Sequence, residues 1–107
     1  SSMEVFIQAI QKHPQTSAAL VLGEMLELGT FALEEHRKLI NSIKAENFAW
    51  VALVGKHFEE LQSLFPKNMH YFDSTEALRV FLHRQTIPLE YIYVKGSRGN
   101  RLETAFE

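Results

Sequence analysis

Two apolar runs decide the fold of this 107-residue chain: Ala18-Ala19-Leu20-Val21-Leu22-Gly23 and Phe48-Ala49-Trp50-Val51-Ala52-Leu53-Val54. Short, continuously apolar runs are typical of strands that are buried on both faces, as in a parallel sheet. Between them, residues 30–46 place apolar side chains at helical spacing. This spacing predicts the crossover helix that two parallel strands require.

The rest of the chain repeats this alternation of helix and strand. Apolar spacing predicts further helices at residues 1–13, 56–65, after Asp73 and at 100–107, and further strands at 69–72 and 89–94. Thr30 and Asp73 are the expected N-caps of the helices that they begin. The pattern predicts an α/β fold, a three-layer α/β/α Rossmann-like single domain over residues 1–107 with a mainly parallel sheet. Right-handed crossovers favour the strand order 3-2-1-4.

Composition excludes several classes of protein. Eleven basic and 13 acidic residues give a formal net charge of −2, so the basic excess of a nucleic-acid binder is missing. The absence of cysteine excludes a disulfide scaffold and a thiolate metal site. No apolar run approaches the roughly 18 residues of a membrane span, and no secretory signal is recognisable at the start. We therefore expect a cytoplasmic protein that binds neither nucleic acid nor a membrane.

Two glycine-bearing loops follow strands that the predicted order makes neighbours. Ligands of open α/β sheets bind beyond the carboxyl ends of the strands, where the strand order reverses, here between the first and fourth strands. The first loop holds Glu24 and Glu27 between Gly23 and Gly29. Taken alone, it favours a plain connection with solvated glutamates. Both loops should lie at the same end of the sheet.

The second loop is a candidate anion site. It consists of Lys95, Gly96, Ser97, Arg98 and Gly99, and it precedes a predicted helix. Free backbone N–H groups at a helix N-terminus and an arginine side chain both favour a carboxylate or a phosphate. A basic turn that merely caps the helix explains the same residues, so the loop alone leaves both interpretations open.

The remaining polar residues form no recognisable catalytic set. The chain has neither a phosphate-loop motif nor a dinucleotide-binding fingerprint. Its five histidines show no i, i+4 pair and no zinc spacing, so no metal site is predicted. His36 lies on the inward stripe of its helix and is interpreted as a satisfied, half-buried histidine. Lys56 and His57, after Gly55, also follow a strand.

Taken together, the two loops carry a resemblance to a known family. Leu22-Gly23-Glu24-Met25-Leu26-Glu27-Leu28-Gly29, with His36 shortly after, resembles the Leu-Gly-Asp-Met-x-Glu-Leu-Gly…His pattern of the MurF ligases, in the Mur ligase family. Val94-Lys95-Gly96-Ser97-Arg98-Gly99, with Leu102-Glu103, resembles the Val-Lys-Gly-Ser-Arg segment of the same family. The resemblance runs from near the first residue to near the last and covers only the C-terminal domain of those enzymes.

The resemblance implies an ATP-dependent ligase of peptidoglycan synthesis. Such an enzyme joins D-alanyl-D-alanine to UDP-N-acetylmuramoyl-tripeptide through an acyl phosphate. ATP and Mg²⁺ would serve the full-length enzyme, held mainly by a central ATPase domain upstream, with no cofactor expected on this region. The resemblance further implies a monomer, an inactive isolated domain with no catalytic residue of its own, and a full sheet of more than four strands, because Ser1-Ser2-Met3 resembles the segment just after an initial strand.

The family also suggests roles for single residues. Lys95, Ser97 and Arg98, with Gly96, would serve the dipeptide carboxylate or the transferred phosphate. Glu24 or Glu27 would orient the dipeptide amine or support its loop, although Glu24 stands where the family more usually has Asp. The supporting residues would be Gly23, Gly29, His36 and Gly99.

Two alternatives remain open at this stage. A free-standing α/β module that binds an anion or regulates a partner, similar to a receiver domain, would share the fold but not the two loops. The C-terminal domain of a sister Mur ligase or of folylpolyglutamate synthase would differ where Lys95-Gly96-Ser97-Arg98 stands.

Overall fold

A four-stranded parallel sheet forms the centre of the computed structural model, which describes residues 2–11, 18–25, 29–44, 46, 48–96 and 101–107. The strands are β1 (Ala18–Gly23), β2 (Trp50–Val54), β3 (Met69–Phe72) and β4 (Tyr91–Lys95). Their order is β3-β2-β1-β4, and every pair of neighbours is parallel. The predicted fold class and strand order are confirmed.

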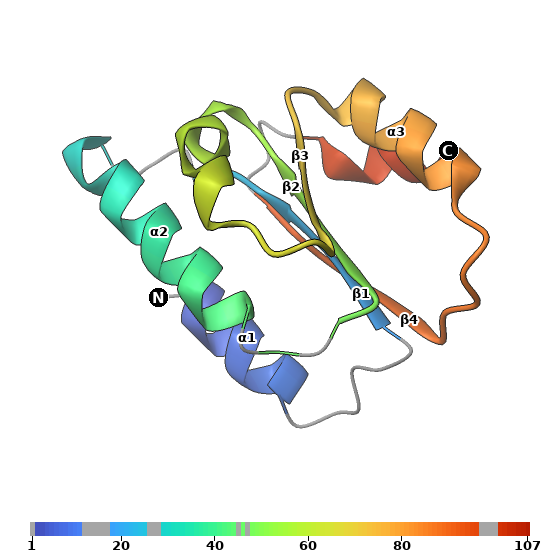
Figure 1. The fold of residues 1–107 in the computed structure, drawn as a ribbon, viewed down its shortest axis with the longest axis horizontal. Coiled ribbons are helices and arrows are strands. Elements are labelled where there is room, and N and C mark those ends of the chain that lie inside the picture. The colour runs from blue at the N-terminus through green and yellow to red at the C-terminus, as the bar shows by residue number, and fades with distance from the viewer. Residues whose placement is uncertain (1, 12–17, 26–28, 45, 47, 97–100) are drawn as a thin grey trace.

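Helices cover both faces of this sheet (Figure 1). α1 (Ser2–Gln11), α2 (Ala32–Ile43) and the 3₁₀ helix η2 (Lys56–Leu64) lie on one face. α3 (Thr75–Arg84) and the 3₁₀ helix η4 (Leu102–Phe106) lie on the other. A further 3₁₀ turn, η1 (Gly29–Phe31), leads into α2. The layers are therefore those of an α/β/α sandwich.

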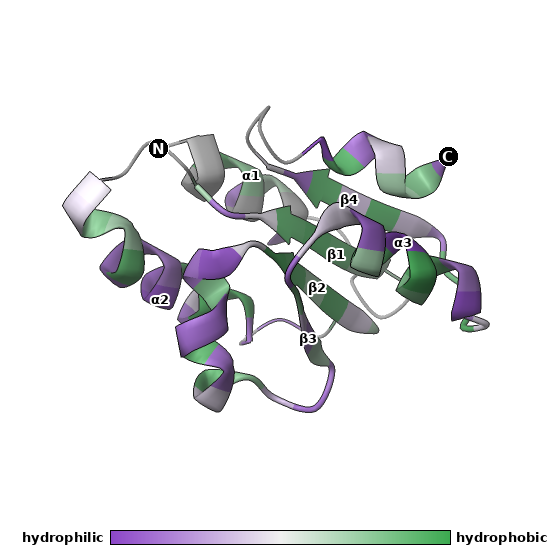
Figure 2. Ribbon diagram, turned by 90° about the horizontal axis from the view of Figure 1, so that it is seen from above, coloured by the Kyte–Doolittle hydropathy of each residue, from purple (hydrophilic) through white to green (hydrophobic). Residues whose placement is uncertain are grey.

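Burial explains why the two central strands could be recognised from their sequence. Every residue of β1 and β2 is buried, whereas β3 and β4, at the sheet edges, are only partly covered. Figure 2 shows β1 and β2 as continuous apolar bands, while the helices alternate between polar and apolar sides. A strand between two helical layers has no solvent face, so it carries no polar alternation.

Two expected helix caps differ from the structure. α3 is capped by Ser74, not by Asp73: the Ser74 hydroxyl accepts a hydrogen bond from the Ala77 N–H at 3.1 Å, with Ser74 in an extended conformation. Thr30 does not cap α2, because it lies inside η1, and the residue before α2 is Phe31, whose side chain makes no capping bond. The 3₁₀ turn starts the helical path before α2 begins and removes the need for a side-chain cap at Thr30.

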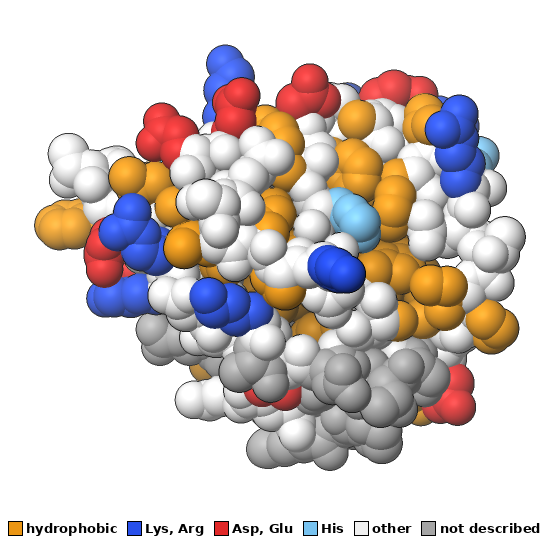
Figure 3. Space-filling model, viewed as in Figure 1, with side chains coloured by type: hydrophobic (Ala, Val, Ile, Leu, Met, Phe, Trp, Pro, Cys, Tyr) orange, Lys and Arg blue, Asp and Glu red, His pale blue; other side chains and the backbone are white. Residues whose placement is uncertain are grey.

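The surface agrees with the near-neutral composition. On the face shown in Figure 3, basic and acidic side chains are interspersed, with apolar side chains between them. Among the described residues, no helix is both long enough and apolar enough to cross a membrane.

Candidate functional site

The carboxyl ends of β1 and β4 lie side by side, as expected from the strand order. In the register of this pair, Leu22 of β1 stands opposite Lys95 of β4. The two glycine-bearing loops therefore begin at the same end of the sheet, at positions one residue apart in the register of β1 with β4. Since paired residues of parallel strands share a face, Lys95 is on the face that α2 and η2 cover.

Some of the expected site residues fall outside the described part of the chain. These are Glu27 in the first loop and Ser97, Arg98 and Gly99 in the second. Of the others, Gly23 is buried at the end of β1, Lys95 is partly buried and Gly96 is exposed. Gly29 has a φ of 57°, in the left-handed region where glycine is favoured.

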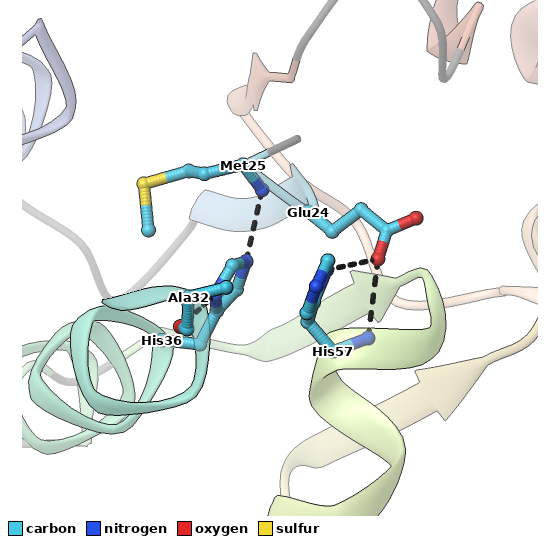
Figure 4. A network of polar contacts seen from close by, with 5 residues as sticks. All are labelled: Glu24, Met25, Ala32, His36 and His57. Carbon is cyan, nitrogen blue, oxygen red and sulfur yellow. Dashed lines mark hydrogen bonds and ion pairs between the residues drawn. The ribbon is translucent and has the colours of Figure 1, made fainter. Parts of the chain in front are cut away.

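The Glu24 side chain reaches from the end of β1 to the start of η2. Its backbone N–H donates to the Val54 carbonyl at 2.9 Å, which extends the pairing of β1 with β2 by one residue. Its carboxylate Oε2 accepts two hydrogen bonds from His57, one from the backbone N–H at 3.1 Å and one from Nδ1 at 2.6 Å (Figure 4). The Glu24 side chain is only 15% exposed. Glu24 is thus an inward-held carboxylate and not a solvated one.

Gly55 makes this crossing possible. A Cβ atom at this position would stand 2.5 to 2.9 Å from three carbon atoms of the Glu24 side chain, closer than van der Waals contact allows. Gly55 also has a φ of 121°, which L-residues rarely adopt, and its N–H donates to the Phe72 carbonyl at 3.0 Å. The ends of β1, β2 and β3 are therefore joined at the edge where Glu24 lies.

His36 of α2 is fully buried beside Glu24, deeper than the half-buried position that its stripe predicts. Its Nε2 accepts from the backbone N–H of Met25 at 2.9 Å, and its Nδ1 donates to the Ala32 carbonyl at 2.5 Å. A backbone N–H can only donate and a carbonyl can only accept, so this arrangement requires the neutral imidazole with its proton on Nδ1. Both ring nitrogens are satisfied, as expected.

The two histidine rings stack and complete a small cluster. The His36 and His57 ring centroids are 4.9 Å apart with an interplanar angle of 16°, and the Phe58 ring meets His36 edge-on at 4.8 Å. We call Glu24, Met25, His36 and His57 the edge cluster. Sequence reasoning assigned no role to His57; the only signal was its place two residues after Gly55, at a strand end.

Stability should fall when the solution is acidified through the range just below pH 6.5. Burial is the main cause that lowers the pKa of His36 from its ordinary value of 6.5. The nearby His57 lowers this pKa further, whereas the hydrogen bond to the Ala32 carbonyl raises it. Between pH 6.5 and the lowered pKa, His36 is therefore protonated in the unfolded chain but neutral in the folded chain. The contribution of neutral His36 to the stability of the fold is fully present above pH 6.5, and it is lost as the pH falls through the lowered pKa.

His36→Gln should reduce this loss, because glutamine does not titrate. Urea unfolding at about pH 7.5 and about pH 5.5 measures it, with the wild type losing more stability than the variant between the two conditions. Equal losses would mean that His36 does not contribute to the acid sensitivity.

A concavity lies on the face of β4 opposite to Lys95. It has a volume of about 310 Å³ and is lined by Val94, Gly96, Leu102, Glu103 and Phe106. Its lining is mostly apolar, with one carboxylate. Within the described ranges, no group of three or more His, Asp or Glu side chains is placed to hold a metal ion.

Comparisons with known proteins identify relatives of this chain in sequence and in structure. No model of a known protein family matches the chain. It is 34% identical over 92 residues to the UDP-N-acetylmuramoyl-tripeptide--D-alanyl-D-alanine ligase of Borreliella burgdorferi, and this match covers 83% of the chain and 20% of that protein. The ligase of the same name from Rickettsia prowazekii is 29% identical over 104 residues, which cover 95% of the chain and 23% of that protein.

A solved structure shows the same fold. MurF from Acinetobacter baumannii superimposes with a TM-score of 0.78 at 22% identity, over 98% of this chain and 24% of that one. The chain spans about a fifth of the length of the curated relatives that it matches. It is homologous to the C-terminal region of MurF, in the Mur ligase family.

Proposed function

We propose that this chain is the C-terminal domain of an ATP-dependent ligase that joins D-alanyl-D-alanine to UDP-N-acetylmuramoyl-tripeptide. In this proposal the domain binds the dipeptide and closes over the ATP site of the central domain. The observation that carries the proposal is the match to ligases of this name, including 34% identity over 92 residues. Such closure brings groups from separate domains together and excludes water from the reaction.

The pairing of β1 with β4 supports a dipeptide site at the carboxyl edge of the sheet. A zwitterionic dipeptide presents one carboxylate and one ammonium group, so it requires both a cationic and an anionic partner. Lys95 ends β4 opposite Leu22, two residues before Glu24. In the proposed site, Lys95, Ser97 and Arg98 with the Gly96 backbone bind the carboxylate or the transferred phosphate, and Glu24 or Glu27 faces the ammonium.

The reaction then divides between this domain and the rest of the enzyme. ATP, when bound, supplies the phosphoryl group that activates the terminal carboxylate of the tripeptide. The dipeptide amine, after losing a proton, attacks the activated carbonyl carbon, the amide bond forms and phosphate leaves. In the described part of this chain, the acidic and histidine side chains form no metal-holding group. In this proposal the upstream domains bind ATP and Mg²⁺, and this domain orients the amine of the dipeptide.

Full-length protein containing this chain should release phosphate only when ATP, the nucleotide tripeptide and D-alanyl-D-alanine are all present. The 107-residue chain alone should release none, because the acyl phosphate forms elsewhere in the enzyme. A continuous phosphate assay, with mass spectrometry of the ligated product, measures both. Turnover by the isolated chain, or a full-length protein that forms no ligated product from these substrates, would contradict the proposal.

A further inference from the structure

We propose that His57 is a positioning residue of this edge: it holds the Glu24 carboxylate across the ends of β1 and β2 and, together with His36, fixes how the chain leaves β1. The inference deepens the proposed function and rests on it, because the segment after β1 is the acidic loop assigned there to the dipeptide.

Two donors of one residue converge on one oxygen of Glu24. The His57 backbone N–H and Nδ1 lie 3.1 and 2.6 Å from Oε2. Bonds to a charged group are the stronger class of hydrogen bond, and two from one residue fix the carboxylate in direction as well as in place. The other oxygen, Oε1, points away from His57 in Figure 4 and accepts no hydrogen bond from the described residues. In the proposed site, this oxygen would be the one that faces a cationic group such as an ammonium.

The next residue of the chain is held in the same way by the other histidine. Met25 follows Glu24, and its N–H donates to Nε2 of His36. Consecutive residues at the exit of β1 are thus bound to histidines of two different elements, η2 and α2. The two rings stack with their centroids 4.9 Å apart, so the two attachments lie side by side.

The length of the Glu24 side chain suits this contact. Aspartate is one methylene shorter, so its carboxylate would end about 1.5 Å closer to β1. With Oε2 already at 2.6 Å from Nδ1, that shortening would break the contact unless the backbone moved. Glutamate at position 24, histidine at position 57 and the missing side chain of Gly55 therefore fit one another.

Two substitutions in the full-length protein separate the hydrogen bond from the ring. His57→Phe keeps a ring that stacks on His36 but loses the Nδ1 donor. His57→Asn loses the ring but places an amide N–H where Nδ1 stands. We expect His57→Phe to raise the KM for D-alanyl-D-alanine about tenfold, with the KM for the nucleotide tripeptide unchanged. His57→Asn should stay within about threefold of the wild type, and His83→Phe, at an exposed position of α3, is the matched control.

Hydrogen–deuterium exchange of the Met25 amide supplies a readout that does not depend on ligation. Its exchange should accelerate in His57→Phe and remain near the wild-type rate in His57→Asn. Unchanged dipeptide KM and unchanged Met25 exchange in His57→Phe would overturn the inference, as would identical behaviour of the two His57 variants. Should the wild-type protein ligate nothing, the proposed function fails, and the Met25 exchange still decides whether His57 positions this edge.

Discussion

Gly55→Ala is expected to lower the free energy of unfolding by about 2–5 kcal/mol. The backbone there has a φ of 121°, and forcing an L-residue into such a conformation costs about 1–3 kcal/mol. The new Cβ would also stand 2.5 Å from the Glu24 carboxyl carbon, so the side chain of Glu24 must move. This movement breaks both hydrogen bonds from His57 to Glu24, which adds roughly 1–2 kcal/mol to the loss of stability.

Gly29→Ala is the matched control for this substitution. Gly29 also has a positive φ, 57°, but a Cβ added there meets nothing within 4 Å. Gly29→Ala should lower the free energy of unfolding only by the strain of the left-handed conformation, about 1–2 kcal/mol. Urea denaturation of both variants measures the difference. Equal losses of stability would mean that the close approach of Glu24 to Gly55 adds nothing to the backbone strain.

The centre of the fold was predictable because burial leaves a direct mark on sequence. Residues 18–23 and 69–72 match β1 and β3 at both ends, and the predicted second strand, 48–54, starts two residues before β2. The sheet order followed from right-handed crossovers, which leave few alternatives once the strands are known. The prediction of the fourth strand is less exact: it gave residues 89–94, whereas β4 spans 91–95. This strand lies at the edge of the sheet, and its apolar residues extend beyond the paired segment.

The edge cluster was not predictable from the sequence. Glu24 and His57 are 33 residues apart, and no local pattern links a glutamate after one strand to a histidine after the next. Their contact needs the register of β1 with β2 and the missing side chain of Gly55, which are properties of the assembled sheet. The cap of α3 was misplaced for a simpler reason: Asp73 and Ser74 are both good caps, and only the backbone conformation selects Ser74.

Arg98→Ala in the full-length enzyme is expected to lower kcat/KM for D-alanyl-D-alanine by about 10- to 100-fold. The loss corresponds to about 1.5–3 kcal/mol, the range for hydrogen bonds to a charged group, at 1.4 kcal/mol per factor of ten. Alanine removes both the charge and the planar pair of donors that suit a carboxylate or a phosphate, whereas Arg98→Lys keeps the charge and should recover part of the loss. Arg84→Ala, at the exposed end of α3, should leave the kinetics unchanged.

The most direct measurement on the proposed dipeptide site is the dependence of ligation on D-alanyl-D-alanine concentration in the wild type, Arg98→Ala and Arg84→Ala, at saturating ATP and nucleotide tripeptide. If this edge of the sheet binds the dipeptide, Arg98→Ala alone shows a higher KM for the dipeptide or a lower kcat, with the KM for the nucleotide tripeptide unchanged. Kinetic constants of Arg98→Ala equal to those of the wild type would contradict a dipeptide site between the ends of β1 and β4.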